Sequence, residues 1–381
     1  MILKCPICKQ IIRSTCCYYQ EKCPVLNNVL YDSLRNSLLA VTGKLNIKQC
    51  QHCGFMFNAD FNPDLMSYEK DYNSSRSNST TYNNYLSSLV KTIKNKIDLN
   101  SNVLEIGSGD GSFLKQLSAE TSCFCWGYDP SYKKIKNLPN NIKFNDEVFD
   151  PEKNKIQFDV IIFRHILEHM WKPYHFLKNL INNKVLKKNA IIIVEVPDLN
   201  WIISSHSFFD FTYEHCNYFN YSSMYNLFYK LKIQPIEKKI VFQNQYLLVF
   251  GVWTQKKQLN ILKNNSNITI DFRQRLEKKK KDLIHIVESA DEICIWGASG
   301  KGVILLSSFQ QEVIEKVNFV IDIDPLKQGK FLPVSGKKVL APDALIGIKK
   351  VVTVLVMNPI YKDEIQWLID KMGIKAQLIL V

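Results

Sequence analysis

The sequence lacks an uninterrupted apolar run of the roughly 20 residues that a membrane-spanning helix needs. Its first residues lead directly into a cysteine motif, without the apolar stretch of a signal peptide. Acidic residues are outnumbered, 36 against 49 Lys and Arg, which gives a net charge of +13. The lysines are scattered, and no arginine- and aromatic-rich stripe indicates an RNA-binding surface. We therefore expect a cytoplasmic protein that contacts neither a membrane nor a nucleic acid.

The length of the chain predicts more than one domain. At 381 residues, 46% of them hydrophobic, it exceeds one ordinary core and can bury a proper interior. We expect two or three globular domains, and a monomer or a weak homodimer.

A loop with three alternating glycines stands between a predicted strand and a predicted helix. Residues 103–106 have strand character, and a helical spacing of apolar residues follows. So sharp a turn needs residues without a Cβ, so that the backbone can approach a ligand. Glu105, inside the strand, distinguishes this loop from a dinucleotide-binding turn. The loop includes Gly107, Ser108, Gly109 and Gly111.

This Glu-x-Gly-x-Gly-x-Gly pattern resembles the first motif of class I S-adenosylmethionine-dependent methyltransferases. The resemblance implies that Glu105 and the loop hold the amine and carboxylate of the methionine part of the cofactor.

A second acid follows the glycine loop at a suitable distance. Residues 123–130 indicate a strand that ends in Asp129 and Pro130, roughly 20 residues after the loop, where a carboxylate would bind ribose hydroxyls. Buried strands are also predicted at 158–163 and 190–197, and His165 after the first of them is expected to line the cofactor. Strands that alternate with helices predict a parallel sheet covered on both faces.

Seven of the eleven cysteines lie in the first 53 residues. Two Cys-x-x-Cys knuckles each direct two thiolates toward one ion, and together they complete a tetrahedral site. Structural disulfides are a poor alternative in a reducing compartment. A redox role is the remaining alternative, and one of the three cysteines between the knuckles is an alternative ligand. The sequence predicts a structural Zn²⁺ site formed by Cys5, Cys8, Cys50 and Cys53.

The last third of the chain predicts a second α/β domain. Residues 255–290 have helical spacing and indicate a connector. A glycine loop at 297–302 follows a predicted strand, and another strand ends in Asp322 about 20 residues later. A further strand is predicted at 351–357. The pattern favours a Rossmann-like domain and leaves open whether that domain binds a nucleotide.

The predicted zinc site, the methyltransferase motifs and the C-terminal Rossmann-like domain together resemble bacterial sugar C-methyltransferases of deoxysugar biosynthesis. The most specific stretch is 322–333, similar to a D-x-x-P-x-K-Q-G-x-x-x-P run of that family, followed by P-x-x-L at 342–345. The resemblance implies an α/β fold in which the doubly wound sheet of a class I methyltransferase is flanked by a small N-terminal zinc domain and a C-terminal Rossmann-like α/β domain. The expected boundaries are 1–65, 66–255 and 256–381.

The implied reaction is methylation of a carbon next to a ketone in a nucleotide-linked keto-deoxysugar. Such a carbon becomes nucleophilic only after a base removes the α-proton and a donor stabilises the enolate. The base region of the family resembles Tyr213, Glu214 and His215, so His215 is expected to take the proton, and Glu214 and Tyr213 to bind the sugar or polarise the enolate. Tyr72 is expected to donate a hydrogen bond to the substrate. Thr212 stands where the family has a tyrosine, which leaves the exact substrate open.

Three other functions fit part of the pattern. The same architecture is compatible with an O- or N-methyltransferase of a polysaccharide or metabolite precursor. A zinc knuckle, a methyltransferase motif and positive charge also occur together in rRNA-modifying enzymes. A non-catalytic scaffold is the third alternative, disfavoured by the intact glycine loop and by its two acids.

Overall fold

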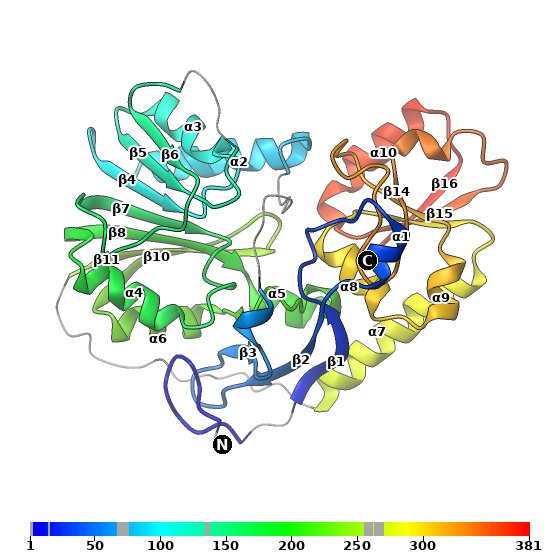
Figure 1. Ribbon diagram of the computed structural model, residues 1–381, viewed down its shortest axis with the longest axis horizontal. Helices are drawn as coiled ribbons and strands as arrows, with labels where there is room; N and C mark the ends of the chain where they lie inside the picture. Colours follow the sequence, from blue (N-terminus) through cyan, green and yellow to red (C-terminus); the bar gives the residue numbers. More distant parts are fainter. Residues whose placement is uncertain (1–2, 14–15, 67–75, 134–137, 255–261, 263–269) are drawn as a thin grey trace.

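The central part of the chain folds around a seven-stranded sheet in the order β10-β11-β8-β7-β4-β5-β6. Figure 1 shows this computed structural model, which describes residues 3–13, 16–66, 76–133, 138–254, 262 and 270–381. Only β11 runs against its neighbours, so the predicted parallel sheet is confirmed with one reversed strand. The strands are β4 (Asn102–Ile106), β5 (Phe124–Tyr128), β6 (Ile142–Asn145), β7 (Phe158–Arg164), β8 (Leu186–Pro197), β10 (Ile233–Val241) and β11 (Tyr246–Trp253).

Strand β8 begins four residues before the expected start at Ala190. Leu186 pairs with Phe158 across a register shift, and regular pairing resumes at Ile191 opposite Val160. The polar residues between them carry no apolar pattern, and for that reason the sequence did not indicate this part of the strand.

Helices cover both faces of the central sheet (Figure 1). On one face, α2 (Thr80–Lys94) and α3 (Ser112–Glu120) bury leucine and valine side chains against alternate residues of β4, β7 and β8. On the other, α4 (Pro173–Asn182) and α6 (Tyr221–Lys230) do the same against the remaining strand residues. This alternation follows from the period of two residues in a strand.

The N-terminal residues form a four-stranded antiparallel sheet in the order β1-β2-β3-β9. Its last strand, β9 (Asn217–Tyr218), comes from the segment between β8 and β10 of the central sheet and pairs with β3. The N-terminal unit is therefore completed by a later part of the chain, and the boundaries given above stay predictions. Its other elements are β1 (Cys16–Pro24), α1 (Leu34–Leu38), β2 (Thr42–Gln49), β3 (Met56–Asn58) and the 3₁₀ turn η1 (Pro63–Leu65).

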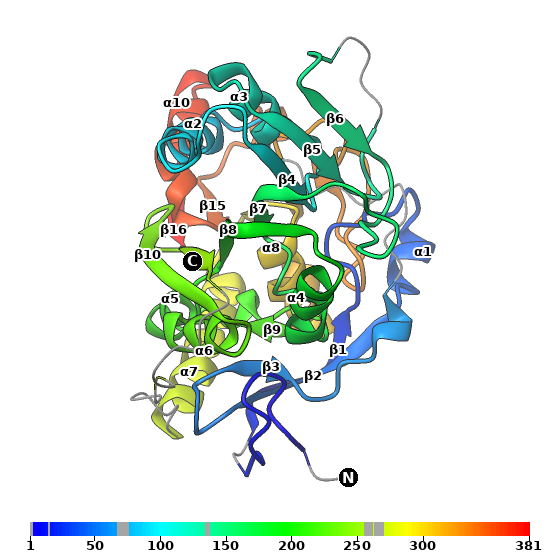
Figure 2. The same ribbon diagram turned by 90° about the vertical axis from the view of Figure 1, so that its left-hand side faces the viewer.

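The C-terminal sheet has five parallel strands in the order β14-β13-β12-β15-β16. Figure 1 shows this unit beside the central unit, with α1 of the N-terminal unit packed against it, and Figure 2 shows the same arrangement turned by 90°. The strands are β12 (Ile293–Trp296), β13 (Phe319–Ile321), β14 (Val339–Leu340), β15 (Val352–Val356) and β16 (Ala376–Leu380). The helical elements are α7 (Ile270–Ser289), α8 (Gly300–Ser307), α9 (Gln311–Lys316), η3 (Pro342–Leu345), η4 (Pro359–Tyr361) and α10 (Lys362–Lys371).

The expected helical connector is confirmed from Ile270 to Ser289, and the expected glycine loop lies between β12 and α8. In the part of the chain that the structure describes, no helix is both long and apolar enough to cross a membrane.

Residues 198–220, here called the bridging segment, join the three units. The segment contains α5 (Leu199–Ser204), η2 (Phe208–Asp210) and β9. Phe208, Phe209 and Phe211 of this segment are buried in one core with side chains of β2 and of α7 and α8. Lys301 of α8 pairs with Asp210 at 2.7 Å, and its ammonium lies 4.3 Å from the ring centre of Trp201. Burial in a shared core fixes this segment far more firmly than a surface loop.

Two hydrogen bonds of Tyr218 close the bridging segment on itself. The Tyr218 hydroxyl accepts from the Thr212 N–H at 3.0 Å and donates to the Thr212 carbonyl at 3.0 Å. All of these groups are buried, so removal of the hydroxyl leaves a peptide group without its partner.

We expect Tyr218→Phe to lower the free energy of unfolding by about 1–3 kcal/mol, because a buried N–H and a buried carbonyl lose their partner. Denaturant titration measures the change. Tyr19→Phe is the matched control, since Tyr19 is 52% exposed on β1. Equal stability of the two variants would contradict this role of Tyr218.

Candidate active site

The glycine loop follows β4 at the carboxyl edge of the central sheet. Gly107, Gly109 and Gly111 all have positive φ, between 54° and 78°, which only glycine adopts at little cost. A Cβ on Gly107 would lie 1.9 Å from Ile166 Cδ1, and one on Gly111 would lie 2.5 Å from the Phe144 ring. At Gly109 no described atom lies within 4 Å of that position, so the middle of the loop faces open space. The loop thus has the open backbone that the sequence predicted.

Asp129 lies beside this loop, as its position after β5 predicts. Its Oδ2 accepts a hydrogen bond from the Gly109 N–H at 2.8 Å, and its Oδ1 accepts from the N–H of Ser131. Pro130, the next residue, is exposed. The structure therefore brings Asp129 and the glycine loop together at one edge of the sheet.

A chain of charged residues, here called the charge chain, runs from the loop across the sheet edge. Arg164 lies 3.5 Å from Glu105 Oε1 and 3.5 Å from Glu195 Oε1, at the ends of three neighbouring strands. His165 continues the chain, with Nε2 3.1 Å from Glu195 and Nδ1 3.4 Å from Glu168 Oε1. The two histidine contacts are ion pairs without hydrogen-bond geometry. All three carboxylates are at most 1% exposed.

The charge chain shifts the pKa values of its members in opposite directions. Burial raises the pKa of Glu105 to about 8, against the effect of Arg164. Burial also disfavours the charge on His165, but Glu168 and Glu195 outweigh it and raise the pKa of this imidazole. For Glu195, burial is outweighed by Arg164 and His165, and its pKa is lowered to about 2. Glu105 is therefore the carboxyl group that most needs a further cation.

Two histidines and two glutamates lie at the far end of the charge chain. The rings of His169 and His215 are 4.7 Å apart and perpendicular, and ligand atoms of both lie within 4.8 Å of Glu168. Glu214 Oε2 is 3.9 Å from His169 Nδ1. Burial lowers the pKa of His169 to about 3, with a further contribution from His215, and burial lowers that of His215 to about 3, with a further contribution from His165. Both imidazoles are therefore neutral at physiological pH.

Hydrogen bonds from several elements hold this group in place. The His215 N–H donates to Thr212 Oγ1 at 3.1 Å, so the residue at the unexpected position supports the histidine. Asn217 ties the bridging segment to the turn after β7: its N–H donates to the Glu168 carbonyl at 3.0 Å, and its side chain donates to the Leu167 carbonyl.

Tyr213 does not join this group, although the sequence placed it there. Its ring is 1% exposed and packs beside Gly43, where a Cβ would lie 2.1 Å from the ring. Its hydroxyl accepts from the Asn62 N–H at 2.8 Å and so points into the N-terminal unit. Tyr72 lies outside the described residues. Of the four expected catalytic residues, the structure brings Glu214 and His215 together.

Sequence reasoning missed Arg164 and Glu195. Both stand at the carboxyl ends of adjacent parallel strands, where ligand-binding groups gather in such sheets. That position was a usable signal, because a charged residue within the last residues of a buried strand is shielded from water and needs a charged or polar partner.

S-adenosylmethionine would be held at the glycine loop by the residues predicted from the first motif. Glu105 Oε2 and Ser108 Oγ are buried and have no hydrogen-bond partner among the described residues. A buried carboxylate beside an open glycine backbone suits an ammonium group, and the orphan hydroxyl suits a further polar group of the cofactor. The residues fit this cofactor.

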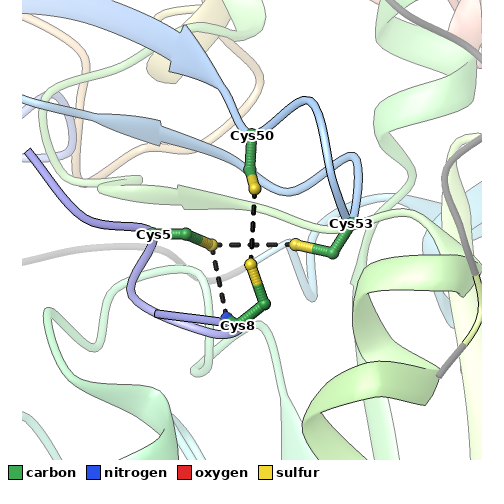
Figure 3. A group of neighbouring side chains, drawn as sticks. All are labelled: Cys5, Cys8, Cys50 and Cys53. Atoms are coloured by element: carbon green, nitrogen blue, oxygen red, sulfur yellow. Dashed lines mark hydrogen bonds between the residues drawn. The ribbon is translucent and has the colours of Figure 1, made fainter. Parts of the chain in front are cut away.

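The four cysteines of the two knuckles converge in one cluster (Figure 3). The Cys5 and Cys53 sulfurs are 3.7 Å apart, and those of Cys8 and Cys50 are 3.4 Å apart. A tetrahedral zinc ion with Zn–S bonds of about 2.3 Å separates its sulfurs by about 3.8 Å, so the spacing fits such an ion. The three cysteines between the knuckles are outside the cluster.

The second glycine loop is closed by residues of its own domain. Asp322 Oδ2 accepts from the Ala298 N–H at 2.9 Å and lies 3.2 Å from the Lys327 ammonium. Asp322 Oδ1 accepts from the Asp324 N–H at 2.9 Å. The acid that would bind a ribose in a nucleotide site is thus engaged within the chain.

Two family models match parts of this chain. A family model described as "Methyltransferase domain" matches residues 79–231, and one described as "C-methyltransferase C-terminal domain" matches residues 254–376. A search of curated proteins found no match.

Solved structures that match less than half of this chain include the following three. A chain of the structure described as a complex between the Haloferax volcanii Trm112 methyltransferase activator and the "putative methyltransferase" is 13% identical (TM-score 0.41), with 49% of this chain and 99% of that chain covered. The N-methyltransferase NodS of Bradyrhizobium japonicum is 14% identical (TM-score 0.33; 46% and 98% covered). Human N-acetylserotonin methyltransferase is 16% identical (TM-score 0.36; 43% and 51% covered).

The matched methyltransferase domain and the open glycine loop with its two acids identify the class of this protein: it is an S-adenosylmethionine-dependent methyltransferase with the α/β fold of class I. It also carries a C-methyltransferase C-terminal domain.

We expect S-adenosylmethionine to bind more tightly as the pH rises from 6 to 8. The free Glu105 has a pKa of about 8 and is mostly protonated at pH 7. A bound ammonium favours the carboxylate, so binding releases a proton and the affinity levels off above pH 8. Calorimetry in buffers of different ionisation enthalpy measures both the affinity and the proton.

The Glu105→Gln variant should bind S-adenosylmethionine more weakly, and its affinity should depend little on pH. Glu312→Gln, which changes an exposed acid on α9, should behave as the unaltered protein. An affinity of the unaltered protein that is constant between pH 6 and 8 would show that Glu105 does not exchange a proton on binding.

Proposed function

We propose that this protein methylates a carbon next to the ketone of a nucleotide-linked keto-deoxysugar. The observation that carries the proposal is the pair of neutral imidazoles, His169 and His215, beside the buried carboxylate of Glu214. The match to a C-methyltransferase C-terminal domain supports carbon as the acceptor. Removal of the proton from a carbon next to a ketone requires an unprotonated base, and the two imidazoles supply one.

His215 is the proposed base. A nitrogen of its neutral ring takes the α-proton, and the electron pair of the broken C–H bond forms the enolate, whose negative charge lies on the keto oxygen. The low pKa of His215 in the free protein keeps the imidazole unprotonated, and it also makes the ring a weak base until the substrate is bound. The enolate then stabilises the new imidazolium by its opposite charge, which offsets part of the burial cost.

Glu214 and His169 orient the acceptor. The Glu214 carboxylate is fixed by a backbone N–H and accepts hydrogen bonds from substrate hydroxyls. Tyr213 joins the base region to the N-terminal unit through Asn62, and Tyr72 is the proposed donor to the enolate oxygen. When bound, S-adenosylmethionine supplies an electrophilic methyl group on a sulfonium, and the enolate carbon forms its new bond as the S–CH₃ bond breaks. The residues of the cofactor side are Glu105, Gly107, Ser108, Gly109, Gly111, Asp129, Pro130 and His165.

We expect the protein to exchange the proton next to the ketone of thymidine-diphosphate-linked 4-keto-6-deoxyglucose in deuterated water. Proton NMR follows the exchange, and mass spectrometry follows the methyl gain when S-adenosylmethionine is added. His215→Ala should lower both rates by about 10²-fold or more, because it removes the proposed base. His285→Ala, on the exposed face of α7, should leave both unchanged.

A methyl gain without exchange would instead indicate oxygen or nitrogen as the acceptor. Cofactor binding without either signal would contradict the sugar substrate.

The cysteine cluster is proposed to hold one structural Zn²⁺ through Cys5, Cys8, Cys50 and Cys53. Four thiolates leave no open position, so the ion stabilises the N-terminal sheet and takes no part in the reaction. The cluster packs in the same core as Phe55 of the N-terminal unit and Phe219 of the bridging segment. We also propose that the protein is cytoplasmic and that it is a monomer or a weak homodimer.

We expect one zinc ion at this cluster per chain, measured by elemental analysis, and its loss in Cys8→Ser together with lower thermal stability, since the metal contributes folding free energy. Cys16→Ser removes a cysteine outside the cluster and should keep the zinc. Retention of zinc by the Cys8 variant would place the ion elsewhere.

A further inference from the structure

Asn27 lies where the three units of the protein meet. It belongs to the loop between β1 and α1 and is 3% exposed. Its backbone N–H donates to Glu214 Oε1 at 2.5 Å, so the N-terminal unit directly holds a residue of the candidate active site. A Cβ built on Gly300, at the start of α8, would lie 3.0 Å from Asn27 Nδ2. The C-terminal glycine loop therefore lies against the other side of this residue.

The side-chain oxygen of Asn27 is buried and has no hydrogen-bond partner among the described residues. A buried acceptor that lacks a donor costs about 1–3 kcal/mol, so such a group is completed by an ordered water or by a ligand. An amide oxygen accepts only, and the missing group is therefore a donor such as a hydroxyl.

The loop that carries Asn27 is fixed at both ends. Next to Asn27, the Val25 N–H donates to the Val41 carbonyl at 2.9 Å. Further along, Tyr31 and Phe331 exchange two backbone hydrogen bonds of 3.0 and 2.8 Å, which join the loop to the C-terminal unit. A group held so firmly selects a ligand by geometry, because little order remains to be lost on binding.

We propose that Asn27 is a specificity-determining residue, whose side-chain oxygen accepts a hydrogen bond from a hydroxyl group of the methyl acceptor. This inference rests on the proposed function and adds a residue of the N-terminal unit to the acceptor site. Asn27 and Glu214 then contact one acceptor from two units, with His169 next to Glu214 and His215 next to His169. The N-terminal unit then has two roles: it contributes a residue to the active site, and it holds the structural metal proposed above.

The test measures methylation and binding of thymidine-diphosphate-linked 4-keto-6-deoxyglucose and of its 2-deoxy and 3-deoxy counterparts. Asn27→Ala removes the acceptor oxygen, and Gly300→Ala displaces the side chain from a different domain. Asn36→Ala is the matched control, since Asn36 is an exposed residue of α1. Kinetics gives kcat and KM for each sugar, and calorimetry gives the Kd.

We expect Asn27→Ala to raise the KM and Kd of the hydroxylated sugar about tenfold or more, with unchanged affinity for S-adenosylmethionine. Gly300→Ala should act in the same direction. On the deoxy sugar that lacks the contacted hydroxyl, the unaltered protein and Asn27→Ala should perform equally, because neither can form the bond. A merely structural role would impair all three sugars alike, and that outcome overturns the inference.

The two proposals fail in different ways. Methylation that is unaffected by Asn27→Ala overturns the role of Asn27 and leaves the function intact. Binding that depends on Asn27 without any methylation or exchange overturns the function alone. If the unaltered protein neither binds nor methylates any of these sugars, both proposals are wrong.

Discussion

The geometry of the active site depends on the burial of the bridging segment between three sheets. Residues 198–220 lie in a core shared with β2, α7 and α8, and β9 within them completes the N-terminal sheet. Lys301 holds one end through Asp210, and Tyr218 closes the other. Glu214 and His215 lie between these fixed points, so their positions are set by packing rather than by a flexible loop.

Electrostatics connects the two halves of the site. The charge chain alternates acids and bases along the carboxyl edge of the central sheet, from Glu105 through Arg164, Glu195 and His165 to Glu168. Buried charges of this kind persist only when each has an opposite neighbour. Glu105 is least compensated and is placed for a cationic cofactor, whereas burial keeps His169 and His215 neutral. One edge of one sheet therefore offers a cation site and a neutral base.

Local signals in the sequence predicted much of this fold. The glycine loop, Asp129 and the two cysteine knuckles are short motifs with a backbone or ligand requirement, and the structure brings each set together. Strands β4, β7, β12 and β15 were predictable because they are buried and apolar, whereas β6, β10 and β16 have exposed residues along their length and were not predicted. The start of β8 was not, since polar residues fill the irregular pairing opposite Phe158.

Contacts between distant segments were beyond such reasoning. Asn27 and Glu214 are 187 positions apart, and no pattern in either segment indicates that they meet. Tyr213 stands next to Glu214 in the sequence, yet its ring packs beside Gly43 of β2, whereas the Glu214 carboxylate lies near His169. Neighbouring residues in an irregular buried segment face directions that only the tertiary packing decides.

Hydrogen–deuterium exchange of residues 207–220 tests most directly whether the bridging segment is a fixed part of the interior. The account predicts that these backbone amides exchange as slowly as those of β7 and β8 in the central sheet, because both are opened only by extensive unfolding. Exchange as fast as that of an exposed turn would contradict it, and the active-site geometry derived from this segment would then have no fixed support.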